Sequence, residues 1–392
     1  MTNADGEVWP AATPPPPPIG YPGHAPSGYP QPRYGPAPVG YGPPPGYGPP
    51  PGYPTPPWYG PPPGYPPPLP PALKPGVIPL RPLSLSDIFN GAVAYIRANP
   101  KATLGLTTIV VVATQIIALI LQAAPLAATG ELAPLRGRQI SDGALVGSSV
   151  AGVASLVTTA LSAILLSGML TVVVGRAVFG GSITIGEAWE KVRGRLPALV
   201  GLTVLEALGA AVLIGVVVLV IVGVAQGSGG AALAIGIPLV IGLVVVLAYL
   251  GTMLSFAPVA IVLERLPVFP AIARSFALVR GSFWRVFGIR LLAAVVAAIV
   301  ANAVAIPFTF AGQLLSIGAS STAVVLVALV LRSVGNAIGQ IITAPFSAGV
   351  VVLLYTDRRI RAEAFDLVLQ TGAAGGPAGP ANSTDHLWLT RR

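Results

Sequence analysis

The sequence predicts an all-α polytopic membrane protein with six transmembrane helices in three repeated units, each preceded by an amphipathic cytoplasmic helix. Three observations support this fold class: six long apolar stretches, a one-sided distribution of basic residues, and an internal repeat. The chain has 53% hydrophobic and only 9% charged residues, whereas an average soluble domain has roughly 25% charged residues. A tail of very different composition precedes the apolar part.

The tail, residues 1–80, is rich in proline, glycine and tyrosine and is predicted to be disordered. It holds most of the 44 prolines, and its tyrosines recur every six residues at Tyr41, Tyr47, Tyr53, Tyr59 and Tyr65. Proline fixes φ and has no N–H to donate, so the run samples extended polyproline II geometry and forms no helix or sheet. Two interpretations remain open: a multivalent segment that binds protein partners, or a solvated spacer with no partner.

The apolar stretches that follow are long enough to cross a hydrocarbon layer of about 30 Å, which takes 18 or more helical residues. The second span of each unit has 33 or 34 residues, so we expect it to tilt, project or bend, with bends at Pro238, Pro258 and Pro345. The membrane domain is thus predicted over residues 81–370, with a flexible tail over residues 371–392. The expected spans are Thr103–Ala123, Leu145–Val178, Pro197–Val224, Ala231–Leu263, Phe287–Phe310 and Thr322–Tyr355.

The basic residues predict the orientation of these spans. Of the 22 Lys and Arg, nineteen fall on the side that carries both termini and two, Arg136 and Arg138, fall on the other. Under the positive-inside rule both termini are cytoplasmic. The net charge of +9 therefore reports topology, and the position of the basic residues at membrane ends disfavours nucleic acid as a partner. Because the first eighty residues lack an apolar h-region, we expect no cleavable signal peptide.

An internal repeat divides the membrane domain into three units. Before each copy lies a short stretch whose apolar residues are spaced to form one helical stripe, which we interpret as an interfacial anchor rather than a gating or docking element. Two of these stretches begin with a capping pattern, Ser84 with Asp87 and Thr184 with Glu187. The aligned positions are Arg97, Arg193 and Arg280; Gly105, Gly201 and Gly288; and Leu106, Leu202 and Ile289.

Three segments carry a family resemblance: "PLRPLSLSDIFNGAVAYIRANP", "AIARSFALVRGSFWRVFGIRLL" and "PFSAGVVVLLYTDRRIRAEAFDLVL". Together they resemble the proline- and glycine-rich integral membrane proteins of actinobacteria, over about residues 78–370. The membrane region of that family looks like the one attached to some glycerophosphoryl diester phosphodiesterases. The resemblance implies a plasma-membrane location. It implies no catalysis, because the phosphodiesterase chemistry resides in a separate metal-binding barrel domain that this chain lacks.

Polar residues inside the spans are the remaining functional candidates. The candidate positions are Glu206, Gln115, Asn302, Asn336 and Gln340. Glu206 is the sole carboxylate well inside a span, and an intramembrane carboxylate is either a functional site or a protonated, hydrogen-bonded group that fastens helices together. Gln115 lies at a similar depth, so a hydrogen bond between the two is expected to be possible. Arg332 lies near the outer interface, which argues against pairing with Glu206.

No catalytic, cofactor-binding or metal-ligating residues are predicted. The chain has no cysteine, and its two histidines, His24 and His386, lie in the predicted tails. We therefore expect a non-enzymatic scaffold or interaction protein that contacts membrane lipids and binds protein partners through its tail, with its oligomeric state left open. The alternative is a transporter or lipid-handling protein with a site near Glu206. A cavity lined by Glu206 and Gln115 favours the alternative, and a sealed bundle favours a scaffold.

Overall fold

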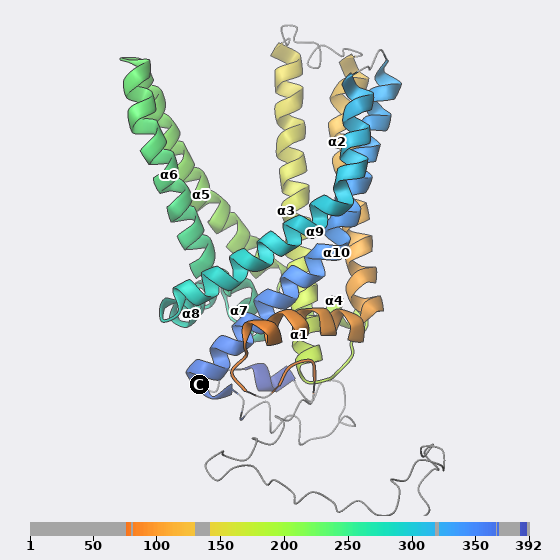
Figure 1. Ribbon diagram of the computed structural model, residues 1–392, viewed down its shortest axis with the longest axis vertical. Helices are drawn as coiled ribbons and strands as arrows, with labels where there is room; N and C mark the ends of the chain where they lie inside the picture. The colour runs from red at the N-terminus through yellow and green to blue at the C-terminus, as the bar shows by residue number, and fades with distance from the viewer. Residues whose placement is uncertain are drawn as a thin grey trace, which may run out of the picture. The chain divides into compact units, whose positions relative to one another are not determined.

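The computed structural model of the protein describes residues 76–79, 81–129, 142–317, 321–365, 367 and 385–389, all within one compact unit, Pro68–Arg392. Within these residues the chain forms helices and no strand, and six segments are long and apolar enough to cross a membrane. The predicted multi-pass, all-α architecture is therefore confirmed; the proline-rich tail and most of the C-terminal tail lie outside the described residues. The helices in Figure 1 are α1 (Leu85–Ala98), α2 (Leu106–Thr129), α3 (Asp142–Val178), α4 (Ile185–Arg193), α5 (Leu196–Ala225), α6 (Gly229–Met253), α7 (Ala257–Leu263), α8 (Val268–Arg280), α9 (Phe283–Ile317) and α10 (Thr322–Glu363).

The fourth span is broken, and the other five are continuous within the described residues. The chain leaves helical geometry between α6 and α7, and Pro258 lies in the first turn of α7, where its missing N–H needs no partner. This confirms the bend predicted there. The helix continues through Pro238 and Pro345 without a break. Figure 1 shows α9 and α10 side by side, each changing direction along its length.

The last span is longer than the sequence predicts. α10 continues past Tyr355 to Glu363, a helix of 42 residues, which is about 63 Å long at 1.5 Å per residue. A hydrocarbon layer of about 30 Å accommodates only half of that length. The end of α10 therefore projects beyond the layer, on the side that carries α1, α4 and α8.

Both predicted capping boxes are present. The Ser84 hydroxyl accepts the Asp87 N–H at 3.1 Å, and the Asp87 carboxylate accepts the Ser84 N–H at 2.9 Å. Thr184 and Glu187 form the same pair of bonds at 3.3 and 2.9 Å. The hydrogen bond from the Thr184 backbone lowers the pKa of Glu187. Each box satisfies orphan N–H groups of a first turn, and it fixes where α1 and α4 begin.

The three repeated units correspond to α1–α3, α4–α7 and α8–α10, which we call units 1, 2 and 3. The three aligned arginines occupy the same place, the last turn of the amphipathic helix: Arg97 in α1, Arg193 in α4 and Arg280 in α8. The three aligned apolar positions are all buried: Leu106, Leu202 and Ile289. The sequence repeat is therefore a structural repeat.

The aligned glycines show how one unit meets the next. A Cβ added at Gly105 would lie 3.8 Å from Ile185, the first residue of α4, and one at Gly201 would lie 3.6 Å from Val268, the first residue of α8. At Gly288 nothing lies within 4 Å. The first span of units 1 and 2 thus touches the amphipathic helix of the following unit, and unit 3 has no following unit in the chain.

Each amphipathic helix packs against the second span of the preceding unit. α4 packs on α3, where Gly168 leaves room for the Val192 side chain. α8 packs on the break between α6 and α7, where the buried Ser275 hydroxyl donates to the Met253 carbonyl and accepts the Phe256 N–H at 3.1 Å. These two backbone groups lack helical partners at the break, so Ser275 stabilises it.

The first amphipathic helix closes the cycle by packing on the last span. Tyr95 of α1 lies against Gly349 of α10, and its hydroxyl donates to the carbonyl of Pro345. Burial raises the pKa of Tyr95 well above its ordinary value, so the hydroxyl keeps the proton that it donates. The three units are therefore arranged cyclically, with unit 1 packed on unit 3.

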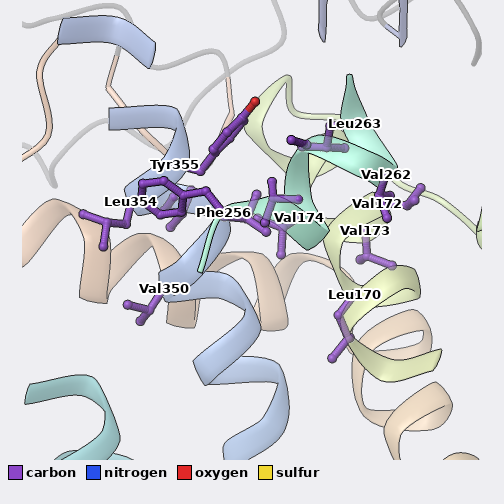
Figure 2. Close-up of a cluster of buried hydrophobic side chains, with 14 of the residues drawn as sticks. Leu170, Val172, Val173, Val174, Phe256, Val262, Leu263, Val350, Leu354 and Tyr355 are labelled. Atoms are coloured by element: carbon purple, nitrogen blue, oxygen red, sulfur yellow. The ribbon is translucent and has the colours of Figure 1, made fainter. Parts of the chain in front are cut away.

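The best-packed part of the core lies where the second spans of the three units meet. Figure 2 shows this cluster of buried side chains, which come from α3, α7 and α10. Its labelled members are Leu170, Val172, Val173, Val174, Phe256, Val262, Leu263, Val350, Leu354 and Tyr355. Since α3 ends at Val178 and α7 at Leu263, this core lies at the end of the spans that carries the amphipathic helices.

Candidate functional site

A cavity of about 800 Å³ lies among the spans, and all three units contribute to its wall. Most of the lining is apolar, including Val111 of α2, Leu166 of α3, Leu205 of α5 and Leu250 of α6. This volume is in the range of roughly 300 to 1,000 Å³ that is typical of small-molecule pockets. The membrane domain is thus not a sealed bundle.

Of the described residues that line this central cavity, two are charged: Glu206 of α5 and Arg290 of α9. Both are partly buried, and the two charges interact electrostatically. The Arg290 Nη1 group also donates to the Gly251 carbonyl of α6 at 2.8 Å. A carboxylate and a guanidinium group from different units therefore face one mostly apolar space. This arrangement suits a ligand that has polar groups on an apolar body.

Hydroxyl and amide groups complete the polar part of the central cavity. Thr114 of α2 and Ser162 of α3 hydrogen-bond to each other across the two helices. The Thr114 hydroxyl also bonds to the Val110 carbonyl of its own helix at 2.7 Å. The other polar lining residues are Thr159, Ser167, Thr171, Ser255, Gln340 and Ser347.

The structure brings together only part of the predicted candidate set. Glu206 and Gln340 line the central cavity, whereas Gln115, Asn302 and Asn336 do not. The Asn302 side chain donates to the Ala298 carbonyl of its own helix at 2.8 Å. Gln115 is partly buried on α2, and it forms no hydrogen bond with Glu206. The expected meeting of these two groups is not found; α5 instead brings Glu206 near unit 3.

Arg290 is the residue that sequence reasoning missed, because it was counted among the basic residues that flank a connection. The signal was present in the repeat alignment. Arg290 follows the aligned Gly288 and Ile289, as Thr107 and Thr203 follow their own glycine and leucine. Both threonine hydroxyls bond within their helix, to Thr103 at 2.7 Å and to Leu199 at 3.0 Å. Arg290 places a charge inside a span at a position where the other two units have threonine. This difference marks Arg290 as a candidate functional residue of the third unit.

The α5–α6 hairpin borders the central cavity and is the most exposed part of the membrane domain. In α5 the buried residues are Leu199 and Leu202, both near its start. None of the most apolar window of α5 is buried, and only 6% of that of the fourth span. Figure 1 shows the two helices leaning away from α3. The hairpin is therefore held at one end, and its remaining apolar surface is available to lipid.

A buried charge network closes the side of the domain that carries the amphipathic helices. The carboxylate of Glu264, at the end of α7, accepts from Arg274 of α8 at 3.1 Å and from the Tyr355 hydroxyl of α10. Arg359 lies 3.5 Å from the same carboxylate, 3.0 Å from the Glu363 carboxylate and 4.1 Å from the Phe365 ring centroid. Burial lowers the pKa of Arg274, but the hydrogen bond to Glu264 and the charges of Glu264, Tyr355 and Glu363 together outweigh it, so the pKa lies above its ordinary value.

A second carboxylate in this region, that of Asp357 near the end of α10, links this helix to the segment that precedes α1. Asp357 is fully buried and accepts the Leu83 N–H at 2.8 Å. It also accepts from Arg361 at 2.9 Å and from Arg285 of α9 at 3.4 Å. Both arginines donate to the Leu83 carbonyl as well. These carboxylates are occupied by cations and N–H groups, and among the described residues no three His, Cys, Asp or Glu side chains gather in a group suited to a metal ion.

The chain was compared with known proteins. A family model described as "Domain of unknown function (DUF7847)" matches residues 83–358, which run from the residue before the first capping box to the last turns of α10. No curated protein matches the chain. No solved structure matches it either.

Proposed function

The chain belongs to the family of the domain of unknown function (DUF7847), and we propose that its membrane domain binds a lipid or another amphipathic molecule in the central cavity. The observation that carries this proposal is the presence of Glu206 and Arg290, which interact electrostatically, on a mostly apolar wall. Two charges inside a membrane-spanning bundle are costly to maintain, so they point to a functional site. The proposal corresponds to the lipid-handling alternative that the sequence leaves open.

The chemistry of the cavity defines the ligand class. The leucine and valine wall accepts an acyl chain or another apolar body, and Glu206 and Arg290 offer an acceptor and a donor to a polar group. A ligand with a donor and an acceptor, such as a zwitterionic or hydroxylated head group, satisfies both side chains. A purely apolar ligand leaves both polar groups without a new partner, so the cavity favours amphipathic molecules.

The exposed α5–α6 hairpin supplies an entrance. Because buried contacts hold this hairpin mainly at Leu199 and Leu202, its far end separates from α3 with little loss of packing. A molecule dissolved in the bilayer then reaches the cavity from the side. Lateral entry suits a lipid better than a water-soluble substrate.

We propose further that the protein lies in the plasma membrane with both termini in the cytoplasm. The last-turn arginines of α1, α4 and α8 all lie on one side of the six spans, in support of the positive-inside orientation. Cysteines introduced at Ser27, Gln226 and Ser383 test it with a membrane-impermeant thiol reagent. We expect labelling from outside only at Gln226, and labelling at either terminus in intact cells contradicts the orientation.

A scaffold function through the proline-rich tail is the second candidate, favoured by the six-residue tyrosine repeat. The resemblance to the membrane region of the phosphodiesterases and the absence of enzymatic activity stay predictions. Deleting residues 1–76 separates the two functions. A scaffold loses its associations on deletion, whereas ligand binding in the central cavity does not depend on the tail.

The decisive experiment fills the cavity. Gly209 of α5 lines it, and nothing lies within 4 Å of a Cβ placed there, so the side chain of Gly209→Phe starts in open space at the cavity wall. Gly223→Phe is the matched control, because Gly223 lies on the same helix in open space away from the cavity. Purified protein is exposed to a photoactivatable phospholipid, and cross-linked peptides are identified by mass spectrometry.

We expect cross-links to peptides of α3, α5 and α10 in the wild type and in Gly223→Phe, with at least a tenfold loss in Gly209→Phe. Glu206→Ala and Arg290→Ala should each reduce the yield for lipids with a polar head group. Equal labelling of the two phenylalanine variants contradicts the proposal. In that case the tail-dependent scaffold becomes the favoured function.

A further inference from the structure

A second cavity, of about 690 Å³, lies at the end of the spans beside α4, and half of its described lining residues are charged. Its wall comes from the end of α3, from α4, from the turn between α4 and α5, and from the end of α7. The charged residues that line it are Arg176, Lys191, Arg195 and Arg265, with Glu187 and Glu190. Among the described residues that line it, four are cations and two are carboxylates.

Within the part of the chain that the structure describes, Arg195 and Arg265 form no ion pair with a carboxylate. Glu187 is engaged in the capping box of α4, where its carboxylate accepts the Thr184 N–H at 2.9 Å. It also interacts electrostatically with Arg176 and Lys191, so its single charge is shared between two cations. Arg195 donates to a carbonyl, that of Arg265, at 3.5 Å, which leaves both guanidinium charges uncompensated by that contact.

The backbone of Arg265 holds these cations near one another. Arg265 has a φ of 58°, in the left-handed region that residues other than glycine rarely adopt. Such a conformation persists only where the surrounding structure fixes it, and observed outliers of this kind gather at binding sites. Here the turn ends α7 and brings Arg265 beside Arg195 of the preceding connection. The contact joins the Arg195 guanidinium to the Arg265 backbone, so both arginines belong to the same part of the cavity wall, where an anion can interact with both of their charges.

The position of the cavity along the spans limits the chemical class of ligand that it can bind. Arg176 lies two residues before the end of α3, and Arg195 immediately precedes α5, so both mark where spans meet the aqueous phase. Trp388 forms another part of the wall, fixed by ring contacts with Phe179 and Phe365 at 5.6 and 5.2 Å between centroids. Basic pockets between spans at this depth suit lipid head groups that carry phosphate.

We propose that this basic cavity binds a phosphate group, carried by an anionic phospholipid head group or by a soluble phosphate ester. Arginine suits phosphate because its planar guanidinium donates two parallel hydrogen bonds. The volume exceeds what a bare phosphate ion needs and accommodates a glycerol phosphate head. This site is separate from the central cavity and does not rest on the function proposed for it.

The test titrates full-length protein in a neutral detergent with dioleoylphosphatidylglycerol or dioleoylphosphatidylcholine and counts bound lipids by native mass spectrometry. The test variant is Lys191→Ala combined with Arg195→Ala. Arg193→Ala is the matched control, because Arg193 is an exposed residue between them that does not line the cavity. We expect the wild type to prefer the anionic lipid. The double variant should lose about 30-fold in affinity, a factor of about five for each basic residue near an anionic head group, and the control less than threefold.

A variant that is expected to bind more tightly distinguishes a specific change in affinity from a loss of binding caused by misfolding. Glu190→Gln removes an opposing negative charge from the wall, so it should bind the anionic lipid several-fold more tightly. Competition with 3-glycerophosphate and with inorganic phosphate distinguishes the two sources of the phosphate group. Displacement of the bound lipid identifies a soluble phosphate ester as the ligand, and persistence of the bound lipid identifies the phospholipid. The proposal is overturned if the wild type binds both lipids equally and also fails to bind 3-glycerophosphate, or if the double variant matches Arg193→Ala. Gly209→Phe should leave this binding unchanged, so failure here is distinct from failure of the central cavity.

Discussion

Removing the Asp357 carboxylate should destabilise the membrane domain more than removing almost any other single polar group. The side chain is 0% exposed and serves three donors at once: the Leu83 N–H, Arg361 and Arg285. Asp357→Ala leaves the buried Leu83 N–H without a partner, which costs about 1 to 3 kcal/mol. The two arginines are 35% and 37% exposed, so each pair adds about 1 kcal/mol at most. The expected total is about 1 to 5 kcal/mol, and its upper part is in the range for breaking a buried pair.

The matched series separates charge from hydrogen bonding. Asp357→Asn keeps an acceptor for the Leu83 N–H and loses the charge, so we expect about 1 to 2 kcal/mol. At roughly 2 to 4 °C per kcal/mol, the alanine variant should lower the midpoint of thermal unfolding in detergent by about 2 to 20 °C. Glu190→Ala, which removes an exposed carboxylate, should shift it by about 2 °C or less. A midpoint for Asp357→Ala within 2 °C of the wild type would refute the reasoning.

Three further predictions address the repeat and its helix contacts. Gly201→Leu should destabilise the protein by about 1 to 3 kcal/mol, because a side chain there meets α8, whereas Gly288→Leu, in open space, should be neutral; equal unfolding midpoints would argue against the cyclic arrangement. Gly349→Ala should cost about 1 to 3 kcal/mol, since its Cβ would lie 2.5 Å from the buried tyrosine ring of α1, and a wild-type midpoint would show that the ring gives way. Thr184→Ala should cost about 1 kcal/mol through loss of the α4 cap. The pKa of Glu187 is lowered on folding. The stability that this cap contributes is therefore fully present above the ordinary pKa of Glu187, and it is lost as the pH falls through the lowered pKa of the folded state. A midpoint difference between wild type and Thr184→Ala that does not shrink on acidification would contradict this.

Features of the fold that depend on neighbours in sequence were predictable. The capping boxes join residues three apart, so the pattern at Ser84 and Thr184 was sufficient to locate the start of two helices. The spans followed from the length of their apolar runs, and the break beside Pro258 from the missing N–H. The alignment of three arginines and three glycines predicted a repeat that the structure confirms.

The site was less predictable, because it depends on how helices far apart in sequence rotate toward one another. Depth along a span is readable from sequence, and on that basis Gln115 was expected to be able to meet Glu206. The side of the helix that a residue faces is set by packing, and packing places Arg290 near Glu206 instead. In the same way the closing motif was recognisable, yet nothing local shows that its Asp357 binds the backbone of Leu83.

The docking of α1 on α10 imposes an order on biosynthesis. The hydroxyl of Tyr95 and the carbonyl of Pro345 are 250 residues apart, and the Leu83 N–H and Asp357 are 274 apart. At about 5 to 20 residues per second, the ribosome needs roughly 14 to 55 s to make the later partner. During that time α1 has left the ribosome without its partner α10, and the bilayer surface is available to cover its apolar stripe. The first helix is therefore a membrane-surface helix before it becomes part of a folded domain, and its transfer onto α10 reports that the last span has been inserted.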